Sequence, residues 1–353
     1  MPLANGNHLK HFGEMTLRAS RRGLVPPFIA MDVLRAANAR EAAGEAIAAD
    51  YRERYGVAVD PAEIFVTTGS SAAFQLAFLA AFEPGDRVAL AAPGYPAYRN
   101  ILSALGLETV LIEVGENAHY QPNPELLADI PDLAGLIVAS PANPTGTMIA
   151  PAELRRLCNY CRERGIRLVS DEIYHGITYE GDAATARAFG REAIIVNSFS
   201  KYYSMTGWRL GWMLVPPDLA RSIECLAQNF YISPPTLSQL SAVAAFDCHA
   251  ELDLHVARYR ANRDRLIATL KKAGLTRFAP AEGAFYLYVD VSALTADSED
   301  FCRRMLAEIG VAATPGADFD PIHGNAWLRF SFAGSSEDVA EAAARLGGWL
   351  RGH

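Results

Sequence analysis

One lysine and one arginine, eight positions apart, suggest a chemistry for this chain. Lys201 and Arg209 lie in the run SFSKYYSMTGWRLG, residues 198–211. A lysine amine can form a Schiff base with an aldehyde, and an arginine can hold a phosphate through several donors. Ser198 adds a hydroxyl, and two glycines let the backbone approach a ligand closely. The run therefore fits a phosphorylated aldehyde, although a solvated surface segment can have the same composition.

Two small turns earlier in the chain add possible contacts for such a ligand. Gly69, Ser70 and Ser71 follow an expected strand at 64–67 and open a helical pattern. Backbone N–H groups at such a helix start attract an anion, but an ordinary serine-capped turn has the same pattern. Tyr95 stands between prolines in a turn after the strand expected at 87–91, where its ring would either stack on a flat ligand or pack in the core.

Polar residues also follow two further expected strands. Asn143 lies between two prolines after 135–139, where its amide can donate to a phenolate oxygen or simply belong to a turn. Asp171 and Tyr174 follow 166–170. A carboxylate at the end of a buried strand is costly unless it is paired. A protonated pyridine nitrogen would be a suitable cation, whereas a helix cap or a structural ion pair is the alternative.

The surrounding pattern predicts an α/β fold with a mostly parallel sheet covered by helices on both faces. Ligands in such sheets bind at the carboxyl ends of the strands. The pattern then gives long helices over 218–270, broken near 233–235, and a smaller α+β domain from about 275. The strands of the large sheet are expected at 64–67, 87–91, 109–113, 135–139, 166–170, 194–197 and 210–215, with helices at 71–82, 98–105 and 152–164. The smaller domain is expected to contain strands 284–289 and 326–332, a helix at 298–309 and a closing helix from 336.

Composition limits the class of protein. The chain has 353 residues, of which 50% are hydrophobic, and this is enough for a large core divided into two domains. A formal charge of −8 argues against nucleic acid as a partner. We expect no membrane partner and a cytoplasmic location, because the first 20 residues lack the apolar run of a signal peptide and no stretch is long enough to span a bilayer.

The five cysteines form no even framework, which favours a reducing compartment. Cys158 and Cys161 make a CxxC pair within a helical pattern that begins with Pro151 and ends at Gly165. Spacing of three places both thiols on one helix face, and no second pair lies nearby to complete a zinc site. We expect a structural role for these cysteines and no metal.

The joint order of these features resembles the class I aminotransferases, which are pyridoxal 5'-phosphate (PLP) enzymes of fold type I on the aspartate-aminotransferase-like branch. The run at 198–211 carries the most specific part of the resemblance, which extends from about residue 51 to the C-terminus. It implies a large PLP-binding domain with an interdomain helix at 51–250 and a small domain at 251–353, to which a shortened segment 1–50 contributes. It also implies a homodimer and substrates that are amino acids and 2-oxo acids.

The resemblance also implies a role for each site residue. Lys201 would form the Schiff base and shuttle a proton, and Asp171 would keep the pyridine nitrogen protonated. Asn143 and Tyr174 would bind the phenolate oxygen of the ring, and Tyr95 would stack on its face. The phosphate would be held by Gly69, Ser70, Ser71, Ser198 and Arg209. Arg329, assisted by Asn143, would bind the substrate α-carboxylate, which a guanidinium can hold through two parallel hydrogen bonds.

The chain departs from the family pattern near residues 44–45. In the family, a strand, a glycine-bearing loop and a tyrosine that reaches the partner's phosphate separate the first two helices. Here a helical pattern at 28–44 continues directly into 45–51, which resembles the second helix. A missing segment would open the substrate side and weaken the contact between subunits, while the cofactor residues, all beyond 68, would remain.

Three functions stay open at this point. The first is transfer of an amino group from an L-amino acid to a 2-oxo acid, and the second is C–S β-elimination or a related lyase reaction on the same cofactor. The third is a shortened homologue that binds PLP but is catalytically impaired. For the substrate, no second arginine motif marks an acidic side chain. Tyr120, Tyr231 and Phe285 suggest an apolar or aromatic one, unless they are core residues.

Overall fold

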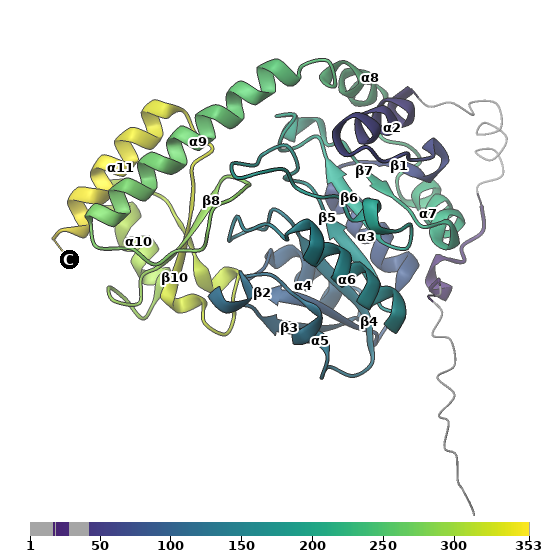
Figure 1. The fold of residues 1–353 in the computed structure, drawn as a ribbon, viewed down its shortest axis with the longest axis horizontal. Coiled ribbons are helices and arrows are strands. Elements are labelled where there is room, and N and C mark those ends of the chain that lie inside the picture. The colour runs from purple at the N-terminus through teal and green to yellow at the C-terminus, as the bar shows by residue number, and fades with distance from the viewer. Residues whose placement is uncertain (1–16, 18, 28–41, 353) are drawn as a thin grey trace, which may run out of the picture.

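The large sheet is the centre of the computed structural model, which describes residues 17, 19–27 and 42–352 (Figure 1). Seven strands lie in the order β1-β7-β6-β5-β4-β2-β3. β2, β3, β4, β5 and β6 pair in parallel, and β7 runs antiparallel to both β1 and β6. The strands are β1 Ile64–Thr67, β2 Arg87–Ala92, β3 Glu108–Glu113, β4 Leu133–Ala139, β5 Arg167–Asp171, β6 Ile194–Ser198 and β7 Gly211–Leu214. The predicted α/β fold and all seven strands are confirmed.

Helices cover both faces of this sheet because its central strands are apolar on both sides. Ile137 and Val169 point toward α3 (Ser70–Ala81), α4 (Pro96–Ala104) and α7 (Pro217–Phe230) in one core cluster. Their neighbours Leu136 and Leu168 belong to a second cluster. That cluster also contains residues of α2 (Ala42–Tyr55), α5 (Pro124–Leu127) and α6 (Pro151–Arg164). The core therefore places the carboxyl ends of the parallel strands, and the loops that follow them, along one edge.

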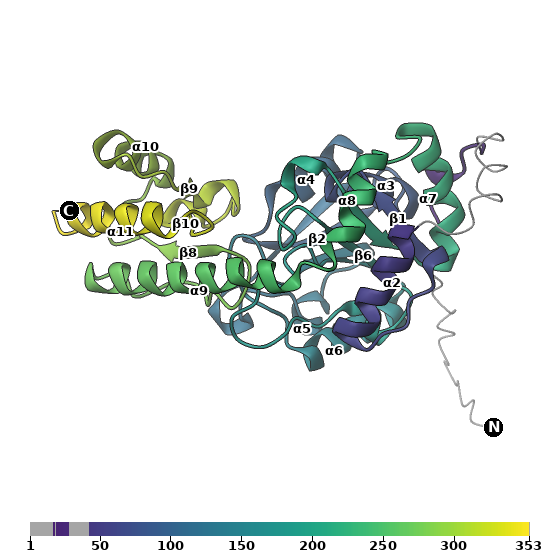
Figure 2. The same cartoon turned by 90° about the horizontal axis from the view of Figure 1, so that it is seen from above.

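A smaller three-stranded sheet lies beside the large one, and the long helix α9 (His249–Lys272) runs from one part to the other (Figure 2). Its antiparallel strands lie in the order β8-β10-β9. Its elements are β8 Tyr286–Asp290, α10 Ser298–Ile309, β9 Thr314–Pro315, β10 Trp327–Ser331 and α11 Ser336–Leu350, and α8 Thr236–Ala245 precedes α9. The α+β pattern expected after residue 275 is confirmed. In the described ranges, no helix is long and apolar enough to cross a membrane.

The junction at residues 44–45 lies inside the continuous helix α2, so the helix expected from Glu45 onward is confirmed. The preceding helical pattern at 28–41 lies outside the described residues. Residues 19–27 lie near α3 and α7, where Ser20 N–H donates to the carbonyl of Ala80. The domain boundaries at 50 and 250 stay predictions.

Candidate active site

A small open hollow lies at the carboxyl ends of β2 and β4. Tyr95, Tyr98 and Asn143 line it, together with residues of both strands. Tyr95 is partly exposed, and its ring meets that of Tyr98 edge-on, with centroids 5.4 Å apart. The hollow is therefore aromatic on one side and has an amide on the other, which suits a flat polar ring.

Asp171 is buried at the end of β5 and has two hydrogen-bond donors. The Tyr98 hydroxyl donates to Oδ2, and the N–H of Ile173 donates to Oδ1 over 3.0 Å. Burial raises the pKa of Asp171 to about 6, while both hydrogen bonds and the charge of Lys201 oppose this rise. The carboxyl is therefore mostly ionised at neutral pH and can pair with a buried cation.

Lys201 follows β6, with its amine 5.8 Å from the ring centre of Tyr174 and 5.7 Å from that of Phe285. Burial lowers the pKa of this lysine, as do the charges of Arg329 and Arg209, whereas Asp171 acts in the opposite direction. A lowered pKa leaves more of the amine unprotonated. The unprotonated amine is the form that attacks a carbonyl carbon.

Gly69 and Arg209 form a cradle at the N-terminus of α3. Gly69 has a φ of 86°, and a Cβ there would lie 2.5 Å from Arg209 Nη2. A Cβ on Gly211 would lie 3.1 Å from the backbone nitrogen of Ser70. Only glycines leave this space open, and the free N–H groups at the start of α3 join the guanidinium around it. The cradle fits the phosphate of PLP, because helix N-termini and arginines both stabilise phosphate oxygens.

The predicted phosphate serines differ in their surroundings. Ser70 and Ser71 are the first two residues of α3. Ser198 is fully buried, and its hydroxyl donates to the carbonyl of Leu210 and lies 2.9 Å from the hydroxyl of Ser200. In this arrangement Ser198 supports the chain that leads to Arg209.

Arg329 lies on β10 of the small sheet and reaches across to the loop after β4. Its Nη1 donates to Asn143 Oδ1 over 2.9 Å, and its Nη2 donates to Thr314 Oγ1 over 3.1 Å. The Nε atom is buried and has no partner within the structure. Because Oδ1 of Asn143 accepts from Arg329, the NH₂ group of the same amide is left to donate toward the hollow.

Aromatic rings surround these polar groups. The guanidinium carbon of Arg329 lies 4.3 Å from the ring centre of Tyr286 and 4.5 Å from that of Phe319. The hydroxyls of Tyr174 and Tyr286 lie 2.9 Å apart. Burial raises the pKa of Tyr174 well above its ordinary value, so its hydroxyl keeps its proton.

The three aromatic residues suggested for substrate recognition lie in different places. Phe285 is beside Lys201. Tyr120 lines the hollow and packs edge-on against Trp327. Tyr231 is farther along the chain at the end of α7, where its hydroxyl donates to Gln75 on α3. Only Phe285 and Tyr120 are therefore placed near the site.

Cys158 and Cys161 lie away from this edge on α6, as buried free thiols of the core. Burial raises the pKa of Cys158 to about 12 and that of Cys161 further above its usual range. Both therefore stay protonated and chemically inert, in keeping with the structural role expected for them.

Several residues of the site were not identified from the sequence. Tyr98 could have been found, because it lies three positions after Tyr95 in the first turn of a helix and so shares its face. Tyr286 and Phe319 are apolar positions without a local motif. Only their packing against Arg329 reveals them.

This fold and site belong to a known family. Residues 37–346 match the family model of aminotransferase class I and II. The chain belongs to this family of PLP-dependent enzymes, which move an amino group between amino acids and 2-oxo acids. The glycine cradle beside Arg209 and the buried Asp171 fit the phosphate and the pyridine nitrogen of that cofactor.

Individual relatives are similar over most of the chain. A valine–pyruvate aminotransferase of Mycobacterium tuberculosis is 54% identical over 311 residues, which cover 87% of this chain and 80% of the relative. The crystal structure of an aminotransferase from M. tuberculosis superposes with a TM-score of 0.87 at 46% identity and covers 95% of this chain and 100% of that chain. A putative aminotransferase from Silicibacter pomeroyi has a TM-score of 0.87 at 47% identity, with 97% of this chain and 90% of the other covered.

Proposed function

We propose that this aminotransferase transfers the amino group of a small apolar L-amino acid, with valine as the type, to pyruvate. The valine–pyruvate aminotransferase that is 54% identical supports this choice of substrates. The observation that carries it is the set of charges around Lys201. Among the described residues, the cations that act on Lys201 are Arg329 and Arg209. One suits a carboxylate and the other a phosphate, so neither of these two described cations is left for an acidic side chain.

The neighbourhood of Arg329 supports the same substrate class. Its guanidinium is held between the rings of Tyr286 and Phe319, with Asn143 and Thr314 at its tip. A guanidinium fixed in this way has its remaining N–H groups in a set direction and can bind an α-carboxylate through two bonds. The rings beside it favour an uncharged, apolar side chain.

The residues at the strand ends are proposed to hold the cofactor ring. Asp171 would pair with the pyridine nitrogen, and Tyr95 would cover the ring face. Asn143 and Tyr174 would donate to the phenolate oxygen. The contacts of the Asn143 amide and of the Tyr174 hydroxyl are with side chains, and neither group donates to a backbone carbonyl among the described residues. PLP supplies an electron-accepting ring that takes up the electron pair released when the substrate loses its α-proton. The ionised Asp171 keeps the ring nitrogen protonated and thereby maintains this capacity.

Gly69, Ser70, Ser71, Ser198 and Arg209 are proposed to hold the phosphate. Lys201 is proposed to hold the cofactor covalently until substrate arrives and then to move the proton from the substrate Cα. Its lowered pKa supports both tasks, because each requires the unprotonated amine.

Covalent attachment is tested by borohydride reduction of the protein mixed with PLP, followed by peptide mass spectrometry. The chain has four lysines, Lys10, Lys201, Lys271 and Lys272, which makes the assignment simple. We expect label on Lys201 alone, none in Lys201→Ala, and full label in the control Lys271→Ala. Label spread over the four lysines, or none on Lys201, would refute the proposed role.

Substrate choice is tested by incubating the enzyme with pyruvate and one L-amino acid at a time. We expect alanine and 3-methyl-2-oxobutanoate from valine, with kcat/KM above that for aspartate and glutamate. A higher kcat/KM for either acidic amino acid would overturn the proposed specificity. Release of ammonia and pyruvate from a sulfur amino acid, without a 2-oxo acid acceptor, would favour the lyase reaction.

A homodimer is proposed from the exposed apolar residues near α8. Phe230, Ile232, Leu237 and Leu240 are all exposed within one stretch of chain. A surface of this kind commonly marks an interface between proteins. Light scattering during gel filtration should give twice the mass of the chain, and Leu237→Lys with Leu240→Lys should reduce it to that of a monomer. The free thiols support a cytoplasmic location, because reducing compartments preserve them.

A further inference from the structure

His175 is a buried histidine just behind the proposed ring-binding residues, and both of its ring nitrogens have partners. Its Nε2 lies 2.9 Å from the carbonyl oxygen of Ser140, and its Nδ1 lies 2.7 Å from the hydroxyl of Tyr55. A carbonyl oxygen can only accept, so Nε2 must carry the hydrogen. Nδ1 then accepts from Tyr55. The two neighbours therefore select one neutral tautomer of the imidazole.

Its surroundings keep this ring uncharged. Burial lowers the pKa of His175 to about 3, and the charge of Arg54 acts in the same direction. The Glu172 carboxyl lies 3.6 Å from Nδ1 and is itself buried. Burial raises the pKa of Glu172 to about 8, so this acid is mostly neutral as well at neutral pH. His175 thus offers one N–H and one lone pair of fixed direction, whatever the pH of the cell.

The position of His175 links two loops of the site. It immediately follows Tyr174, in the turn after β5 that also carries Asp171. Its bond to Ser140 joins this turn to the residue that follows β4 and begins the loop leading to Asn143. The imidazole therefore connects the two ring-binding loops, next to a direct bond of 3.3 Å from the N–H of Ser140 to the carbonyl of Asp171.

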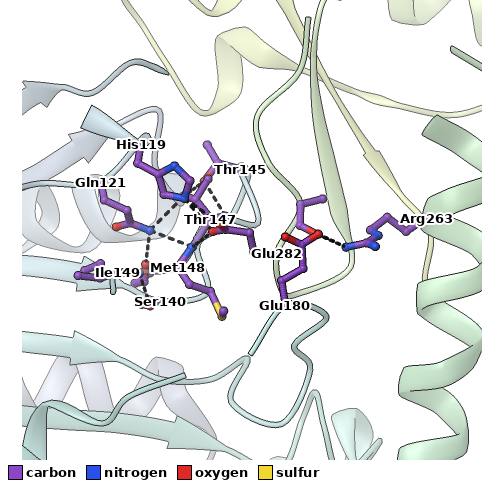
Figure 3. A network of polar contacts seen from close by, with 12 residues as sticks. His119, Gln121, Ser140, Thr145, Thr147, Met148, Ile149, Glu180, Arg263 and Glu282 are labelled. Atoms are coloured by element: carbon purple, nitrogen blue, oxygen red, sulfur yellow. Dashed lines mark hydrogen bonds and ion pairs between the residues drawn. The ribbon is translucent and has the colours of Figure 1, made fainter. Parts of the chain in front are cut away.

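The loop from Ser140 to Ile149 is held at its other end by a separate network. Gln121 donates to the carbonyl of Thr147 over 2.9 Å, and Glu282 accepts from the N–H of Met148 over 2.8 Å (Figure 3). Ser140 Oγ accepts from the N–H of Ile149 and closes the loop. Asn143 lies between these two anchored ends. The position of its amide therefore depends on the hydrogen bonds that hold the two ends of the loop.

We propose that His175 is a positioning residue that fixes Asn143 through Ser140, and that Tyr55 on α2 orients it. The inference rests on the proposed role of Asn143 toward the cofactor ring and on the hydrogen bond that the same amide accepts from Arg329. Through Tyr55, helix α2 takes part in positioning the site. Loss of the Nε2 donor would let the Ser140 end of the loop move, and the Asn143 donor would lose its direction.

Three substitutions at His175 separate positioning from packing. Glutamine is long enough to place an amide N–H near the position of Nε2, whereas asparagine reaches only the position of Nδ1. Phenylalanine fills the volume without a donor. The readouts are the dissociation constant of PLP, measured by equilibrium dialysis, and the pH midpoint of the absorbance change of the bound cofactor. Neither readout depends on turnover.

We expect His175→Phe and His175→Asn to weaken PLP binding about five- to tenfold, in the range of one lost buried hydrogen bond. Both should move the absorbance midpoint in the same direction as Asn143→Ala. His175→Gln should have a PLP dissociation constant and an absorbance midpoint close to those of the original protein. Tyr55→Phe should change PLP affinity and the midpoint in the same direction but by less. The His175 ring then keeps its Nε2 donor but loses the hydroxyl partner of Nδ1 that selects the tautomer.

Two outcomes would overturn the inference. Unchanged midpoints in all three His175 variants would reduce His175 to a packing residue, and equal shifts in all three would exclude the Nε2 donor as the cause. The double variant His175→Phe with Asn143→Ala should move the midpoint no further than Asn143→Ala alone, because both act through one amide. If Asn143→Ala itself leaves the midpoint unchanged, the proposed role of Asn143 fails. If the midpoint shifts in Asn143→Ala but in none of the His175 variants, only the positioning role of His175 is rejected.

Discussion

Tyr98 donates a hydrogen bond to Asp171, although the two residues follow strands that are separated in the sheet by β4. Tyr98 comes from the first turn of α4, and Asp171 ends β5. Burial raises the pKa of Asp171 to about 6, and the donated bond restrains the rise. The tyrosine therefore helps to keep a buried carboxylate ionised where a cationic ring nitrogen is expected.

Tyr98→Phe should weaken PLP binding at pH 7 by roughly five- to tenfold, since a hydrogen bond to a charged group is lost while the ring remains. The pKa of Asp171 should rise, so more of the carboxyl is protonated at neutral pH. The defect should shrink toward pH 8.5, where the carboxyl ionises in either protein. Equilibrium dialysis between pH 7 and pH 8.5 measures the PLP dissociation constant of the variant and of the original protein. Tyr160→Phe, on α6, is the control, and equal affinities for both variants at pH 7 would contradict the assignment.

Glu172→Gln should stabilise the protein at alkaline pH. The folded pKa of Glu172, about 8, lies above its ordinary value because the carboxyl is buried, despite hydrogen bonds from Ala186, Thr185 and Ser170. For such an acid, stability is full below the unfolded pKa and is lost as the pH rises through the folded one. Glutamine removes this loss. Urea denaturation at pH 9 should show a gain of about 1–3 kcal/mol that disappears near pH 5.

The exposed Glu163→Gln serves as the control for that experiment and should show no such pH dependence. A constant difference between Glu172→Gln and the original protein at every pH would mean that the carboxyl is ionised throughout.

Gly69→Ala should damage the phosphate cradle. The added Cβ would lie 2.5 Å from Arg209 Nη2, in a backbone with φ of 86°. We expect PLP to bind at least tenfold more weakly, while the affinity for pyridoxal, which lacks the phosphate, changes little. Gly85→Ala is a matched control, with φ of 87° and no atom within 4 Å of the new Cβ. Both variants carry a backbone cost of about 1–2 kcal/mol, so only the difference in PLP binding reports the clash. Equal binding by the two variants would disprove the cradle.

Arg329→Lys should raise KM for the amino acid by roughly ten- to a hundredfold, because a lysine cannot make two parallel bonds to a carboxylate. The PLP dissociation constant should change less than in Asn143→Ala, because Arg329 acts on the proposed ring site only through the Asn143 amide. Steady-state kinetics and dialysis separate the two effects. Arg303→Lys, on the exposed face of α10, should behave as the original enzyme. A loss of PLP binding as large as that of Asn143→Ala, with KM for the amino acid unchanged, would place this arginine with the cofactor.

Local patterns were sufficient to predict most of the elements. The alternation of β-branched runs with helical segments located all seven strands of the large sheet, and helix α10 was predicted with the bounds that the structure shows. These elements follow from short-range periodicity and from start and stop residues, such as Pro151 before α6 and Gly165, in the left-handed region, after it. The helix break near 233–235 follows from two prolines in the same way.

The residues with a distinctive chemistry were also identifiable in the sequence. Lys201, Asp171, Asn143 and Arg209 stand next to strand ends, and their order along the chain carries the resemblance from which their roles are predicted. Their neighbours could not be identified in this way. Tyr286 and Phe319 beside Arg329 are ordinary aromatic residues until the small sheet is placed against the large one.

The sequence by itself determined the family and the cofactor and predicted the reactive residues, since these depend on residue type and on distance along the chain. The tertiary structure decided which side chains control them. Tyr98 lies 73 positions from Asp171, Tyr55 lies 120 positions from His175, and Asn143 lies 186 positions from Arg329. Contacts over such separations depend on strand order and on the packing of the two sheets. No local pattern carries that information, because each strand is compatible with many neighbours until the whole core is formed.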